Sequence, residues 1–141
     1  MAEKEFDVVV AGHVALDVIP DMSGLSGDLI SSLRPGTLVT IGPVVASTGG
    51  PVSNTGISLH KLGVKTGFMG KVGDDFFGRE LLDRFAKIGA SDSMSVVEGE
   101  STSYSLVITP PGVDRMFLHH PGCNDTFGLA DVKFGVGFTF R

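Results

Sequence analysis

The chain has 141 residues, of which 42% are hydrophobic and 19% are charged, and its formal net charge is −5 at pH 7. This composition favours a packed core over disorder, and an acidic chain without a Lys/Arg cluster argues against nucleic acid as a partner. Cys123 is the single cysteine, no apolar run approaches the ~20 residues that span a bilayer, and the charged start is unlike a signal peptide, so we expect a cytoplasmic protein without a disulfide.

The first part of the chain is predicted to form strands. Residues 6–11 are a β-branched run that ends at Gly12, which is typical of a buried strand followed by a turn. Residues 14–19 and 37–41 are predicted as two further strands. The stretch 22–36 is rich in Ser, Gly and Asp and is expected to hold a short helix at best.

Two helices follow. Gly49-Gly50-Pro51 opens the first, because proline fits the first helical position, and Gly63 fits its end. Residues 64–72 are predicted as one strand. Asp74 or Asp75 can cap the second helix. Its buried face is expected to carry Phe77, Leu81, Phe85 and Ile88, which recur at helical spacing.

The last predicted unit is a hairpin with strands near 102–109 and 115–119, joined by a turn rich in Pro and Gly. The strand–helix–strand–helix order of residues 37–97 indicates an α/β sheet with at least one parallel crossover. The hairpin is expected to be an antiparallel addition.

The densest candidate site is the segment 48–54, Thr-Gly-Gly-Pro-Val-Ser-Asn. Gly49 and Gly50 let the backbone approach a ligand, the helix that follows offers unpaired N–H groups, and Asn54 can both donate and accept hydrogen bonds. These properties suit a polyhydroxylated molecule. A plain strand-to-helix turn, with Ser53 or Asn54 as the cap, is the structural alternative and stays open.

Other candidates are weaker when taken singly. Asp17 follows a predicted buried strand and could accept hydrogen bonds from two hydroxyls, although a surface aspartate would look the same. The segment 70–78 fits either a hinge beside a ligand or a strand, a turn and a capped helix, and the second interpretation is favoured. His119 and His120 would point to opposite faces of a strand, which makes them a poor metal pair and favours structural or surface roles.

Together these segments resemble the ribokinase/PfkB carbohydrate kinase family from about residue 6 to residue 132. Gly49, Gly50, Asn54, Gly63 and Gly73 meet the spacing of the family's first signature. The order of the other segments, listed along the chain, also matches: residues 9–12 with Asp17, residues 73–78, the hairpin, and residues 122–124. Val52 and Gly56 depart from the pattern beside the sugar site, so the sugar is not identified.

The resemblance implies an α/β, ribokinase-like three-layer αβα fold with a small β-sheet lid, of which residues 1–141 are the incomplete N-terminal portion. Lid strands would lie near 14–19, 37–41, 102–109 and 115–119, and the lid is an expected homodimer interface. The expected substrate-binding residues are Asp17, Gly49, Gly50, Asn54, Arg115 and Asn124. No metal site is expected in the chain.

The resemblance also implies the activity. The expected function is phosphoryl transfer from ATP to a hydroxyl of a sugar or nucleoside, with ATP and Mg²⁺ serving the full-length parent. The family's catalytic Asp, in a Gly-Ala-Gly-Asp motif, has no counterpart here, so we expect no catalytic residue in this chain and none of these cofactors bound tightly by it. A non-catalytic polyol-binding or self-associating fragment, or a decayed fragment, are the alternatives.

Overall fold

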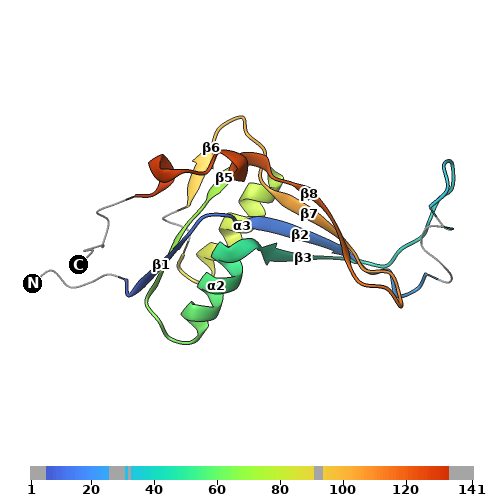
Figure 1. Ribbon diagram of the computed structural model, residues 1–141, viewed down its shortest axis with the longest axis horizontal. Helices are drawn as coiled ribbons and strands as arrows, with labels where there is room; N and C mark the ends of the chain where they lie inside the picture. Colours follow the sequence, from blue (N-terminus) through green and yellow to red (C-terminus); the bar gives the residue numbers. More distant parts are fainter. Residues whose placement is uncertain (1–5, 26–30, 32, 91–93, 134–141) are drawn as a thin grey trace, which may run out of the picture.

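The computed structural model describes residues 6–25, 31, 33–90 and 94–133. The helices and strands within these residues are arranged as an α/β body with an extended sheet that leaves it (Figure 1). The strands are β1 (Val8–Ala11), β2 (Ala15–Pro20), β3 (Val44–Gly49), β4 (Thr66–Met69), β5 (Lys71–Gly73), β6 (Ser95–Val97), β7 (Tyr104–Ile108) and β8 (Met116–His120). The helices are α2 (Gly50–Lys61) and α3 (Phe76–Ala86), followed by the short 3-10 turns η1 (Gly122–Thr126) and η2 (Leu129–Asp131).

The body contains two parallel strand pairs. β1 pairs with β4 and the chain between them includes α2, whereas β5 pairs with β6 and the chain between them includes α3. Both pairs are strand–helix–strand crossovers. The predicted α/β class with a parallel crossover is confirmed.

A separate, four-stranded sheet has the order β3-β2-β7-β8 and is called the lid sheet here. β2 is antiparallel to β3 and parallel to β7, and β7 forms the predicted hairpin with β8. In Figure 1 this sheet begins against the helices and reaches well beyond them. The root of the lid sheet therefore adjoins the body, and its far end stands clear.

The core lies where the two helices meet the body strands and the root of the lid sheet. Phe68 of β4 packs edge-on against Phe85 of α3, with the ring centroids 5.4 Å apart. A side chain on Gly56 of α2 would collide with the Phe68 ring, so the helix lies close to the strand. The buried hydrophobic cluster comprises Val14, Leu16, Val52, Phe68, Val72, Leu81, Phe85 and Met94.

Both predicted helices are confirmed, but α3 ends at Ala86, so Ile88, which was predicted on its buried face, lies beyond the helix. Gly63 has φ +83° just after α2, a conformation that favours glycine. Asp75 caps α3, because its Oδ1 accepts a hydrogen bond from the Gly78 N–H at 2.8 Å. Glu80 and Arg84 form an ion pair one turn apart, at 2.7 Å.

Two predicted strands are wrong. Residues 37–41 form no strand, because β2 pairs with residues 44–49 instead and its last pair is Pro20 with Val44, which leaves the preceding residues beyond the end of their partner. The single strand predicted over 64–72 is two strands, interrupted at Gly70, where the chain changes partner from β1 to β6.

The helix considered within 22–36 falls partly outside the described residues, and residues 91–93 and 134–141 lie wholly outside them. Within the described ranges, none of the helices combines the length and apolar character required to cross a membrane.

Candidate functional site

The site centres on the carboxylate of one aspartate in the middle of a strand. Asp17 lies in the middle of β2, opposite Ser47 of β3 and Ser105 of β7. Among the described residues, neither a hydrogen bond nor an ion pair reaches its carboxylate. A β-carbon on Gly49 would stand 2.5 Å from Asp17 Oδ2, so the absence of a side chain at Gly49 makes room for this group. The structure brings together two of the predicted residues, Asp17 and Gly49.

A row of polar residues crosses one face of the lid sheet at this level. Residues directly opposite each other in paired strands share a face, so Ser47, Asp17, Ser105 and His119 lie side by side across all four strands. Ser105 is 6% exposed, and its Oγ lies 3.1 Å from His119 Nδ1. This row offers both hydrogen-bond acceptors and donors to a ligand rich in hydroxyls.

Gly50 continues the site into the start of α2. Its φ is +83°, and a β-carbon there would stand 2.6 Å from the His13 carbonyl oxygen, so both conformation and space call for glycine. The expectation that this helix start presents free N–H groups is only partly met. Pro51 has none, and the Val52 N–H donates to the His13 carbonyl at 3.1 Å.

The capping alternative for Ser53 and Asn54 is not seen, because α2 has no side-chain cap and Gly49 is its N-cap residue. Ser53 Oγ is buried and has no hydrogen-bond partner among the described residues. Asn54 is exposed, and being four residues after Gly50 it lies on the same side of the helix. The Asn54 side chain is therefore accessible on the helix side that begins at the glycine pair.

Asn124 has a different role. Its Oδ1 accepts from the Val14 N–H at 3.3 Å, and its Nδ2 donates to the Val14 carbonyl at 2.6 Å. Both ends of the amide are therefore bound to the backbone just after His13. The structure places Asn124 beside the site as a brace for the turn between β1 and β2.

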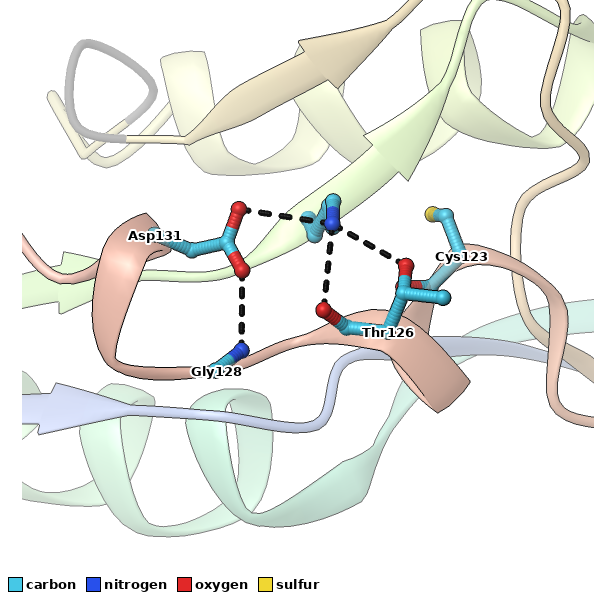
Figure 2. Close-up of polar contacts among 5 residues, drawn as sticks. Cys123, Thr126, Gly128 and Asp131 are labelled. Carbon is cyan, nitrogen blue, oxygen red and sulfur yellow. Dashed lines mark hydrogen bonds and ion pairs between the residues drawn. The ribbon is translucent and has the colours of Figure 1, made fainter.

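A charged cluster holds the segment that carries Asn124. Lys71 of β5 donates to the Thr126 carbonyl at 3.3 Å and to Thr126 Oγ1 at 3.0 Å, and pairs with Asp131 Oδ1 at 3.3 Å (Figure 2). Asp131 Oδ2 also accepts from the Gly128 N–H. The ammonium group thereby ties η1 and η2 to the body, and Cys123 is buried beside them; its burial raises the pKa of the thiol.

Arg115 is separated from the other predicted residues. It precedes β8 at the free end of the hairpin, and its guanidinium carbon lies 5.4 Å from the centre of the Phe117 ring. Arg115 lies four positions before His119, and four positions of extended chain span about 13 Å at ~3.3 Å per residue. The structure does not bring Arg115 to Asp17.

The segment 70–78 has the structural role that the sequence favoured. Besides capping α3, Asp75 accepts a hydrogen bond from the Thr102 N–H at 2.8 Å. Partial burial of Asp75 opposes ionisation, but the hydrogen bonds from Thr102 and Gly78 outweigh it and lower the pKa of the carboxyl. Side chains on Gly73 and Gly78 would collide with the Glu100 and Gly73 carbonyl groups respectively.

Sequence reasoning missed His13 and gave His119 a structural or surface role. The two rings stack with their centroids 5.3 Å apart, beside Asp17. His120 does face the other side of the sheet, where its ring lies tilted against that of Tyr104, with the centroids 5.4 Å apart. The alternation of β8 could have placed His119 on the Asp17 face, but only with the register of all four lid strands in hand.

Comparison with known proteins agrees with this architecture. Residues 5–133 match the family described as pfkB family carbohydrate kinase. The chain is 30% identical over 135 residues to fructokinase-2 of Oryza sativa subsp. japonica, covering 95% of this chain and 37% of that protein. Among solved structures, ribokinase from Giardia lamblia superimposes with a TM-score of 0.70 at 21% identity, over 89% of this chain and 36% of that one.

A nucleoside kinase from Burkholderia thailandensis, solved in complex with inosine, superimposes with a TM-score of 0.62 at 21% identity, over 82% of this chain and 36% of that one. These likenesses define an incomplete ribokinase-like α/β fold. The chain belongs to the pfkB family of carbohydrate kinases. It spans about a third of the length of the curated relatives it matches.

Proposed function

We propose that this chain is the substrate-binding portion of an ATP-dependent carbohydrate kinase, which transfers a phosphoryl group from ATP to a hydroxyl of a sugar or nucleoside. The observation that carries the proposal is the unpartnered Asp17 carboxylate set against Gly49. A carboxylate accepts hydrogen bonds from two adjacent hydroxyls, a pattern that sugars and ribosides share.

The proposed roles follow from the geometry of each residue. Asp17 accepts from the substrate hydroxyls, Gly49 and Gly50 allow the substrate to approach the backbone, and Asn54 contacts it from α2. Asn124 acts by bracing the His13–Val14 turn, since its amide is already bound there. Arg115, at the hairpin end, would contact substrate only if the lid closes over the site.

ATP and Mg²⁺ are assigned to the parent protein outside these residues. Across the part of the chain that the structure describes, no group of three or more His, Cys, Asp and Glu side chains is arranged to hold a metal ion. The sequence also contains no Gly-Ala-Gly-Asp segment, from which the family's catalytic base comes. We therefore propose that residues 1–141 bind substrate and that the isolated chain does not phosphorylate it.

A thermal-shift titration of the purified chain tests this function. D-fructose, D-ribose and inosine would each be added with and without Mg-ATP, since a ligand that binds the folded form raises the unfolding midpoint. We expect one of the three to raise the midpoint and Mg-ATP alone to leave it unchanged. A chain stabilised by Mg-ATP but by none of the three compounds would contradict the assignment.

One observation favours self-association as well. The far half of the lid sheet exposes apolar side chains on the face opposite Asp17, where Leu106 pairs with Leu118 and Ile108 with Met116. Leu118 is 61% exposed, and Val44 on the same face is 56% exposed. We propose that two copies cover this face in a homodimer through the lid.

A further inference from the structure

Two stacked imidazole rings connect the body to the lid sheet next to Asp17. His13 lies in the turn between β1 and β2, and His119 lies on β8, at the opposite edge of the lid sheet from β3. The planes of the rings differ by 26°. His119 belongs to the polar row that contains Asp17, but the proposed function assigns neither imidazole a contact with the substrate.

Two buried serines orient the rings: Ser103, which immediately precedes β7, and Ser105, which lies in β7. Ser103 is fully buried and its hydroxyl donates to the His120 carbonyl at 3.1 Å, which commits its single proton. Ser103 Oγ can then only accept from His13 Nε2, 3.4 Å away. A neutral His13 therefore carries its proton on Nε2, and its Nδ1 is a hydrogen-bond acceptor.

Each ring keeps one nitrogen free. His119 Nδ1 is taken by Ser105 Oγ at 3.1 Å, whereas His119 Nε2 and His13 Nδ1 have no partner among the described residues. The ring of His13 also borders the glycine pair, because a β-carbon on Gly50 would stand 2.8 Å from its Cδ2. Two nitrogens held in place by serines but left unbonded are suited to meeting a ligand.

We propose that His13 and His119 are further substrate-binding residues of this site, and that His13 Nδ1 accepts a hydrogen bond from a hydroxyl of the polyol. This inference rests on the proposed function, since it concerns the same substrate. The Asp17 carboxylate and the His13 nitrogen would then act as neighbouring acceptors for a molecule that presents several hydroxyl donors.

The proposal makes binding depend on pH. Burial, and secondarily the neighbouring His119, lower the pKa of His13, while Asp17 raises it by less. Among the described residues, the groups that hydrogen-bond to the pair are Ser103, just before β7, and Ser105 of β7, and the first turn of α2 carries no acidic residue. Because the pKa of His13 is lowered, the ring gains a proton on Nδ1, and so loses the acceptor, only at a pH below the ordinary histidine pKa of about 6.5.

Isothermal titration of D-fructose, D-ribose and inosine into the whole chain, at about pH 7.5 and about pH 5, tests this, because the lower value lies well below the ordinary histidine pKa of about 6.5. We expect the affinity of whichever compound binds to fall about fivefold or more at the lower pH, as for the loss of one hydrogen bond. His13→Gln keeps a group near Nε2 but removes the Nδ1 acceptor, so it should bind weakly at both values. His13→Asn keeps an acceptor near Nδ1 that does not titrate, so it should bind nearly as the unaltered chain does, without the pH dependence.

His120→Gln is the matched control, because this ring lies on the other face of the same strand and should leave both affinity and pH dependence unchanged. Nitrogen NMR of the unaltered chain adds a readout that needs no variant: the bound compound should shift the His13 Nδ1 resonance and leave that of exposed His60 in place. A compound that binds without that shift, with equal affinity at both pH values, would overturn the inference and leave the proposed function standing. If none of the three compounds binds at either pH, both are overturned.

Discussion

At the scale of single residues, the site depends on the absence of a side chain at Gly49. Its backbone has φ −125° and ψ 175°, which any residue adopts, so the glycine is required by space alone. The neighbour that needs the space is the Asp17 carboxyl group. Glycine is thus required at position 49 to make room for Asp17, the proposed substrate-binding residue, and not to form the turn.

Substituting Gly49 by alanine should therefore disable binding. The new methyl group would stand within 3 Å of all three carboxyl atoms of Asp17 and force that side chain out of place. We expect the sugar-induced thermal shift to disappear. Gly24→Ala is the control, since a β-carbon there meets nothing within 4 Å, and it should keep the full shift. Equal sugar-induced thermal shifts in the two variants would show that sugar binding does not require glycine at position 49.

The two asparagines of the site should behave differently when shortened to alanine. Asn124→Ala leaves the N–H and carbonyl of buried Val14 without partners, so we expect the free energy of unfolding to drop by about 1–3 kcal/mol. Asn54→Ala alters an exposed side chain, so it should change the free energy of unfolding by no more than ~0.5 kcal/mol. It should nevertheless weaken sugar binding. Urea unfolding measures the first effect and calorimetric titration the second. An Asn124→Ala variant as stable as the unaltered chain would show that the Asn124 amide does not stabilise the turn at Val14.

At the scale of elements, Asp75 connects α3 to the loop that leads into β7. Its carboxylate accepts from both the Gly78 and Thr102 N–H groups. Asp75→Ala should lower the free energy of unfolding by about 1–2 kcal/mol, as for other lost N-caps. Asp74→Ala, which removes one exposed bond to Gly99, should cost less.

The pH dependence of this contribution has a definite sign. Because the pKa of Asp75 is lowered in the folded chain, its stabilisation is present above the ordinary aspartate pKa of about 3.9 and is lost as the pH falls through the lower, folded value. Urea unfolding curves of Asp75→Ala and the unaltered chain should therefore converge in strong acid. A constant difference down to pH 2 would contradict the assigned role.

The elements that the sequence predicted are those whose signals are local. The proline and glycine at the ends of α2, and the Asp cap and apolar stripe of α3, act within a few residues, and both helices were predicted correctly. Residues 37–41 have strand-like side chains but lie beyond the last residue pair between β2 and β3, so they do not join this strand ladder. Whether a stretch becomes a strand depends on its neighbour, which local pattern does not reveal.

The same limit applies to the site. Gly49, Gly50 and Asn54 lie within six residues of one another, and their pattern could be recognised along the chain. His13 and His119 are 106 positions apart and meet only through the register of four lid strands. Asn124 could be identified as a site residue, but its bonds to Val14 appear only once η1 is placed against β5.

At the scale of the whole molecule, the two faces of the lid sheet differ in the side chains that they carry. One carries the polar row through Asp17, and the other is buried near the body but exposed and apolar toward its end. Leu118→Lys introduces a charge into that exposed end without touching the core. We expect it to convert a dimer to a monomer, measured as mass by light scattering after gel filtration.

Thr109→Lys serves as the control for added charge, since Thr109 is exposed and lies outside every lid strand. That variant should remain dimeric. An unaltered chain that is monomeric at about 100 μM, a concentration at which a complex with micromolar Kd would form, would contradict the proposed lid dimer.

The central claim is that Asp17 binds substrate hydroxyls, and it is tested most directly by titrating whichever of D-fructose, D-ribose and inosine binds the unaltered chain into Asp17→Asn. The amide keeps the shape of the side chain but loses the charge and one acceptor, so we expect affinity to fall by about tenfold or more. Asp83→Asn makes the same change on the exposed side of α3 and should bind normally. If Asp17→Asn binds as tightly as Asp83→Asn, the substrate site lies elsewhere on the chain.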